Sequence, residues 1–76
     1  MVTARSPAHV ALGKAVRGLR EERGLSQEAL AAETDLDRTY VGGIERGERN
    51  PSFEALKRLA DSLKVRVSEL FERAGE

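Results

Sequence analysis

The hydrophobic positions of the chain recur at helical spacing, and no segment alternates in the way of a half-buried strand. Leu12, Val16 and Leu19 lie at i, i+4 and i+7, which predicts a helix over 8–23. The segment before it, 1–7, shows no period. It is therefore predicted to be a flexible N-terminal arm.

Capping residues predict two shorter helices in the middle of the chain. Ser26 can accept a hydrogen bond from a free backbone N–H at the start of a helix over 26–33, and Asp37 can do so for a helix over 37–46. Gly47 can end the second of these helices. The residues expected to face inward are Leu30, Ala31, Val41 and Ile44. Two short helices joined by a tight turn form a helix-turn-helix, whose second helix can lie in the major groove of DNA.

Two further helices are predicted before the C-terminus. The first follows the turn Asn50-Pro51-Ser52, and its apolar face is expected to hold Phe53, Leu56, Leu59, Ala60 and Leu63. The second covers about 67–73 and ends before Gly75. The sequence therefore predicts an all-α domain of five short helices over 8–76.

Length and composition limit the kind of protein this can be. The chain has 76 residues and no cysteine, so it is expected to form one small core without a disulfide or a thiolate metal site. Its stability must then come from helix packing or from association. No apolar run approaches the ~20 residues that span a bilayer, and no signal peptide is evident. A soluble protein of the cytoplasm is therefore expected.

The charge is balanced overall but unevenly distributed. The 13 basic and 13 acidic residues give a net charge of zero, whereas a nucleic-acid-binding domain is usually basic. Residues 25–37 contain four acidic residues and no basic one, whereas 38–50 contain three arginines and two glutamates. Non-specific affinity for DNA should be weak, because that affinity grows with the number of phosphates neutralised.

The stretch from Leu25 to Ser52, LSQEALAAETDLDRTYVGGIERGERNPS, resembles the Cro/C1-type helix-turn-helix family, also called XRE-like regulators. The resemblance covers roughly Leu12 to Phe71. The run from Leu36 to Tyr40, followed by IERG and Arg-Asn, is similar to the small controller proteins of restriction–modification systems. It implies a lambda-repressor-like fold and a homodimeric transcriptional regulator that binds a pseudo-palindromic double-stranded DNA operator, in the cytoplasm with the nucleoid.

The resemblance also implies which residues contact DNA. The family's base-reading positions are occupied here by Arg38, Thr39, Tyr40 and Arg49. Its backbone-contacting positions are occupied by Gln27, Arg46 and Asn50. Arg38 suits a bidentate contact to guanine O6 and N7, and Thr39 can offer a methyl group to thymine. Two structural alternatives stay open: Tyr40 could pack over the turn, and the two loop arginines could pair with Glu48.

The chain departs from the family pattern at three places. Asp35 stands where relatives usually carry a left-handed glycine, a conformation that aspartate tolerates at some cost. Gly42 and Gly43 replace polar side chains of the third helix, each at a cost of about 0.8–1 kcal/mol relative to alanine. Ala29 replaces the glutamate that would complete a capping box with Ser26. Specificity is then expected to depend on the first turn of the third helix and on DNA shape.

Two further expectations concern the fold and its assembly. Relatives join the positions of Arg20 and Glu45 by a partly buried ion pair between the first and third helices, so the same pair is predicted here. In the family the last helix often forms the dimer face. Leu70 is expected to face inward, which leaves Val67 and Phe71, four residues apart, to meet a second copy. A place for Phe71 in the core of its own chain is an equal alternative.

Other classes of function find less support. His9 is the only histidine and has no nucleophile or metal-ligand set beside it, and no glycine-rich phosphate loop follows a strand. We therefore expect no enzyme activity, no cofactor, no metal and no small-molecule effector. Three aromatic residues are too few for a single-stranded RNA platform. The main alternative is a protein-binding adaptor, or an antitoxin-like partner, that keeps the helix-turn-helix fold without reading DNA.

Overall fold

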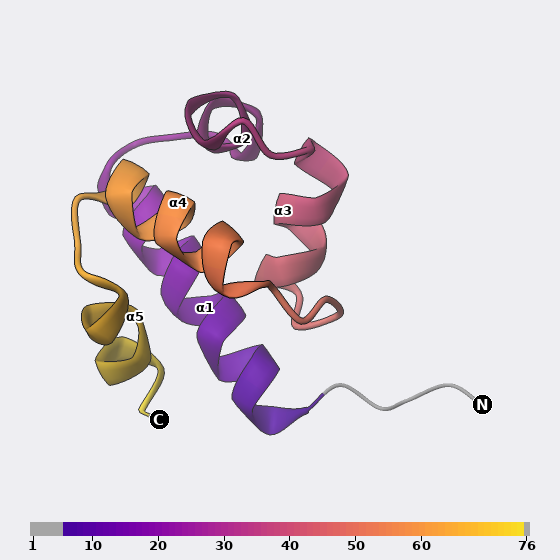
Figure 1. Ribbon diagram of the computed structural model, residues 1–76, viewed down its shortest axis with the longest axis vertical. Helices are drawn as coiled ribbons and strands as arrows, with labels where there is room; N and C mark the ends of the chain where they lie inside the picture. Colours follow the sequence, from indigo (N-terminus) through magenta and orange to yellow (C-terminus); the bar gives the residue numbers. More distant parts are fainter. Residues whose placement is uncertain (1–5, 76) are drawn as a thin grey trace.

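The structure, a computed structural model, describes residues 6–75, and within them the chain forms five helices and no strand. The helices are α1 Pro7–Glu22, α2 Gln27–Thr34, α3 Arg38–Glu45, α4 Phe53–Leu63 and α5 Val67–Ala74. The predicted all-α class is confirmed. Figure 1 shows α1 running through the middle of the molecule, with α3 and α5 on opposite sides of it.

The start of α1 lies one residue earlier than predicted. Ser6 Oγ accepts hydrogen bonds from the backbone N–H groups of Ala8 and His9, at 3.1 and 3.4 Å. With Ser6 as N-cap, Pro7 becomes the first helical residue, a position where a missing N–H costs nothing. The predicted arm 1–7 falls almost entirely on residues 1–5, outside the described residues.

The predicted caps begin and end the other helices. Ser26 accepts from Ala29 N–H at 3.0 Å, Asp37 from Thr39 N–H at 2.9 Å and Ser52 from Ala55 N–H at 3.1 Å. The described glycines with positive φ are Gly24, Gly47 and Gly75, each of which follows a helix, as predicted for Gly47 and Gly75. Asp35 ends α2 in the left-handed conformation, with φ 58°. It therefore makes the turn between α2 and α3 in place of the usual glycine.

All five helices contribute to one hydrophobic core. Its fully buried large side chains are Val16, Leu30, Val41, Ile44, Leu59 and Leu70. The prediction for Phe53 is wrong, because its side chain is 71% exposed. As the first residue of α4, Phe53 lies beyond the edge of the core, and Ala55 is buried in that turn instead.

Polar side chains attach α5 to α1 at the rim of the core. Arg73 donates from Nη1 and Nη2 to the two carboxylate oxygens of Glu22, at 2.7 and 3.0 Å. These hydrogen bonds hold the pKa of the Glu22 carboxyl below its usual value. No helix within the described part of the chain is long and apolar enough to cross a membrane.

Candidate nucleic-acid interface

The first turn of α3 presents two polar side chains to solvent. Arg38 and Thr39 are both exposed, and Asp37 caps the helix below them. Arg38 Nε lies 3.9 Å from Glu28 Oε2, and both side chains are more than half exposed. Such a contact is weak in water, so the guanidinium of Arg38 remains available to an incoming ligand.

Tyr40 lies differently from its two neighbours. It is half-buried and packs against the hydrophobic core. Its hydroxyl accepts a hydrogen bond from the backbone N–H of Ser52 at 3.4 Å, which links α3 to the start of α4. Tyr40 thus makes the packing contact that was one of the two alternatives from the sequence. Its hydroxyl proton is not used in that bond and could still be donated to a phosphate or a base.

The loop between α3 and α4 carries two exposed arginines, and these differ in their partners. Arg46 Nε donates to Glu48 Oε1 at 3.0 Å. This pairing of a loop arginine with Glu48 is the other alternative from the sequence. Arg49 makes no side-chain hydrogen bond or ion pair within residues 6–75. Asn50, the third polar residue expected in this loop, is also exposed. The loop therefore offers one guanidinium that has no acidic partner inside the described chain.

The side chain of Gln27, expected at a phosphate, points into the protein. Its Nε2 donates to Glu45 Oε1 at 2.9 Å, although the two residues are 18 positions apart. Gln27 is half-buried at the first position of α2. Its side chain thus joins α2 to the end of α3. No local signal predicts this contact, because it depends on how the two helices pack.

Arg20 and Glu45 are brought together by the packing of α1 against α3. Arg20 donates to Glu45 from Nε at 2.7 Å and from Nη2 at 3.1 Å. The two side chains are only 11% and 2% exposed, and Arg20 also donates to Leu25 O at 2.7 Å. The hydrogen bond to Glu45 raises the pKa of the Arg20 guanidinium. Since Gln27 shares the same carboxylate, α1, α2 and α3 are held in one fixed orientation.

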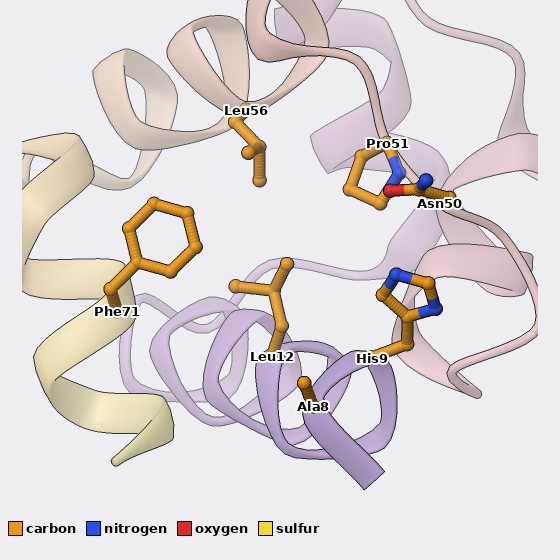
Figure 2. A pocket seen from close by; sticks show the side chains of 7 residues that line it. All are labelled: Ala8, His9, Leu12, Asn50, Pro51, Leu56 and Phe71. Atoms are coloured by element: carbon orange, nitrogen blue, oxygen red, sulfur yellow. The ribbon is translucent and has the colours of Figure 1, made fainter. Parts of the chain in front are cut away.

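The two residues predicted at a dimer face lie at the other side of the molecule, on α5. Val67 is half-buried and packs against the core, whereas Phe71 is 36% exposed. Figure 2 shows the ring of Phe71 facing Leu12 and Leu56 across an open cleft of about 230 Å³. Ala8, His9, Asn50 and Pro51 complete its lining. Phe71 therefore forms the wall of a surface cleft and is not enclosed in the core.

The described residues provide no evident set of metal ligands. No group of three or more histidine, cysteine, aspartate or glutamate side chains within 6–75 is arranged to hold a metal ion. The features that remain are an exposed helix start, an arginine-bearing loop and a rigid scaffold behind them. Such an arrangement can form hydrogen bonds to base edges and phosphates.

Comparisons with known proteins agree with this geometry. The helix-turn-helix family matches residues 16–70. Control protein C.MunI of a Mycoplasma species is 44% identical over 63 residues, which cover 82% of this chain and 85% of that protein. The crystal structure of the restriction–modification controller protein C.AhdI from Aeromonas hydrophila matches with a TM-score of 0.80 and 48% identity, over 82% of this chain and 94% of that one.

A second controller structure bears on the start of α3. The restriction–modification controller protein C.Esp1396I matches with a TM-score of 0.82 and 35% identity, over 91% of each chain. Its solved variants include alanine replacements of an arginine and a tyrosine and of the threonine between them. This chain carries the same three residue types in the same order at 38–40. The chain belongs to the Cro/C1-type helix-turn-helix family, and along most of its length it is similar to the restriction–modification controller proteins.

Proposed function

We propose that this protein is a sequence-specific DNA-binding transcriptional regulator that acts as a homodimer on a pseudo-palindromic operator. The observation that carries the proposal is the exposed first turn of α3, where Arg38 and Thr39 face solvent. Arginine and threonine provide hydrogen bonds and a methyl group suited to the edges of base pairs in the major groove. The buried ion pair between Arg20 and Glu45 keeps this helix in a fixed orientation, so that binding does not have to order it.

Around these base contacts, we propose a set of contacts to the DNA backbone. Arg46 and Asn50, both exposed, would follow the phosphates from the loop after α3. Gln27 would contribute through the backbone N–H groups at the start of α2, since its side chain is bonded to Glu45. Tyr40, predicted to contact a base, would donate its hydroxyl proton to a base edge or a phosphate while its oxygen still accepts from the backbone N–H of Ser52.

Two copies would place two reading helices on successive turns of DNA. Since α3 and α5 lie on opposite sides of α1 (Figure 1), pairing through Val67 and Phe71 leaves both copies of α3 exposed. Half-sites about one helical turn apart, roughly 34 Å, would then be contacted from one face of the duplex. Similarity to controller proteins supports a role in controlling a restriction–modification system. A DNA target would place the protein with the nucleoid in the cytoplasm.

The adaptor alternative is less well supported by the surface of α3. The centre of a protein-binding surface is usually enriched in aromatic side chains and methionine as well as arginine. The first turn of α3 exposes no aromatic or large apolar side chain beside Arg38, since its aromatic residue, Tyr40, is half-buried. The net charge of zero limits the non-specific term of DNA binding but does not prevent base recognition.

The base-reading role of Arg38 predicts a loss confined to the correct sequence. Arg38→Ala should weaken binding to an operator by about 1–3 kcal/mol, because a bidentate contact to guanine is lost. The operator would be a duplex selected by the wild-type protein from a random library. Titration against this duplex and a scrambled one, at fixed salt, measures the effect.

A matched variant tests whether the loss of one positive charge is enough to weaken operator binding. Arg66→Ala removes the same charge at an exposed position just before α5, and α5 lies on the opposite side of α1 from α3 (Figure 1). It should bind the operator like the wild type. Equal losses on the two duplexes for Arg38→Ala would show that Arg38 does not read a base.

The dimer predicts that a charge at Phe71 separates the two copies. Phe71→Arg should give a folded monomer at micromolar concentration with at least about tenfold weaker operator binding, because two like charges would meet at the symmetry axis. The core residue Leu70 is untouched. Analytical ultracentrifugation measures the oligomeric state, and Phe53→Arg, at the other exposed phenylalanine, should remain a dimer. A wild-type protein that is monomeric at this concentration and binds a single half-site tightly would exclude this assembly.

A further inference from the structure

Two adjacent glycines lie in the second turn of α3, and both are buried. Glycine is unfavourable in a helix interior, because it loses more conformational freedom on folding than any other residue. Neither Gly42 nor Gly43 is among the described glycines with positive φ. Their presence is therefore explained by the space around them and not by backbone conformation.

The space beside Gly43 is filled by the side chain of Arg49. A Cβ atom at Gly43 would lie 2.5 Å from Arg49 Cγ and 3.3 Å from its Nε. Because Cγ is near the base of the side chain, moving the guanidinium alone would not relieve this overlap. Gly42 is different, since a Cβ there would meet only the ends of flexible side chains, at 3.0 Å from Arg46 Nη1 and 3.4 Å from Gln27 Oε1.

Backbone hydrogen bonds hold Arg49 in this place. The N–H groups of Glu48 and Arg49 both donate to the carbonyl oxygen of Gly43, at 2.8 and 3.3 Å. The preceding residue, Gly47, is left-handed, and a Cβ there would lie 2.8 Å from the Cα of Val10. The loop is thus attached to α3 and pressed against α1. Its position directs the side chain of Arg49 back across the helix.

Arg49 extends the exposed face that begins in the first turn of α3. Gly43 follows Thr39 by four residues, so the two positions lie on the same face of the helix, one turn apart. Arg49 is exposed and has no acidic partner within residues 6–75. A guanidinium is therefore placed over the second turn of α3, where the helix has no side chain of its own.

We infer that Gly43 is a positioning residue for sequence recognition. By lacking a side chain it leaves room for Arg49 to lie across α3 and to read a base edge beside the one contacted from the first turn. A guanidinium held against a helix in the major groove is suited to the O6 and N7 atoms of guanine. This inference rests on the proposed DNA-binding function. It adds a base contact beside the second turn of α3 to the expectation that specificity depends on the first turn and on DNA shape.

A double-mutant cycle tests this inference. Gly43→Ala should weaken binding to the selected operator by about tenfold, with less than about twofold change on the scrambled duplex. In an Arg49→Ala background the same substitution should change operator binding by less than about twofold, because its effect acts through Arg49. Gly18→Ala is the matched control: it adds a Cβ to helix α1 with no atom within 4 Å, and it should bind like the wild type.

Thermal melting separates recognition from folding. Gly43→Ala should stay folded and melt within a few degrees of the wild type, because the gain in helix propensity offsets part of the cost of rotating the whole Arg49 side chain away from the new Cβ. If the single variant does not fold, the double variant with Arg49→Ala should, because it removes the overlap. An equal loss of affinity in both backgrounds, an unchanged affinity, or a double variant that is also unfolded would overturn the role of Gly43. A wild-type protein that selects no sequence at all would instead overturn the proposed function, and this inference with it.

Discussion

Replacing Glu45 by alanine is expected to lower the free energy of unfolding by about 3–5 kcal/mol, because removal of one partner leaves a buried charge unmatched. Glu45 accepts three hydrogen bonds, two from Arg20 and one from Gln27. The guanidinium left behind belongs to a side chain that is only 11% exposed. For a domain of this size each kcal/mol corresponds to about 4–8 °C. The melting temperature should therefore fall by well over 10 °C.

A surface glutamate in the same chain provides the matched control. Glu21 also accepts a hydrogen bond from an arginine Nε, at 3.1 Å from Arg17, but both side chains are more than half exposed. Exposed pairs of this kind contribute about 0–1 kcal/mol, so Glu21→Ala should melt close to the wild type. Thermal denaturation followed by circular dichroism compares the two. A Glu45→Ala protein that melts within a degree or two of the wild type would mean that its ion pair adds nothing to stability.

The helix boundaries could be predicted because their signals are local. Ser26, Asp37 and Ser52 accept hydrogen bonds from N–H groups two or three residues ahead. Such contacts need no knowledge of the tertiary structure. Phe53 shows where helical periodicity fails. The residue after an N-cap has the correct spacing, but it projects beyond the end of the core, and its side chain is 71% exposed.

The arrangement within the candidate site depends on contacts between distant parts of the chain. Family resemblance predicts that Gln27 and Arg49 contact DNA, but it does not predict where their side chains lie in the free protein. The direction of Gln27 depends on Glu45, which is 18 positions away, and that of Arg49 depends on how the loop folds back on Gly43. Neither contact can be predicted from periodicity or residue spacing in the sequence.

Gly13 is a second residue whose importance appears only in the packed structure. It is buried in α1, between apolar positions that predict a helix equally well with alanine in its place. A Cβ at Gly13 would lie 2.3 Å from Ile44 O and 2.5 Å from Glu45 O. These are backbone atoms at the end of α3, so they cannot move without the helix itself. The absence of a side chain at Gly13 therefore sets how closely α1 and α3 approach.

Gly13→Ala is accordingly expected to destabilise the protein by about 3 kcal/mol, at the upper end of the usual range for overpacking. This loss should exceed the gain of about 1 kcal/mol that alanine brings to an isolated helix. Displacing α3 would also move Glu45 relative to Arg20 and so weaken their ion pair, whose Nε–Oε2 distance is 2.7 Å. Thermal melting and operator titration should therefore both show a loss.

Gly18→Ala provides the contrast on the same helix. A Cβ at Gly18 meets no atom within 4 Å, so only the gain in helix propensity remains, up to about 1 kcal/mol. The two substitutions are chemically identical, yet they should shift the melting temperature in opposite directions. If Gly13→Ala melted as high as Gly18→Ala, the position of α3 would not depend on close backbone packing against α1.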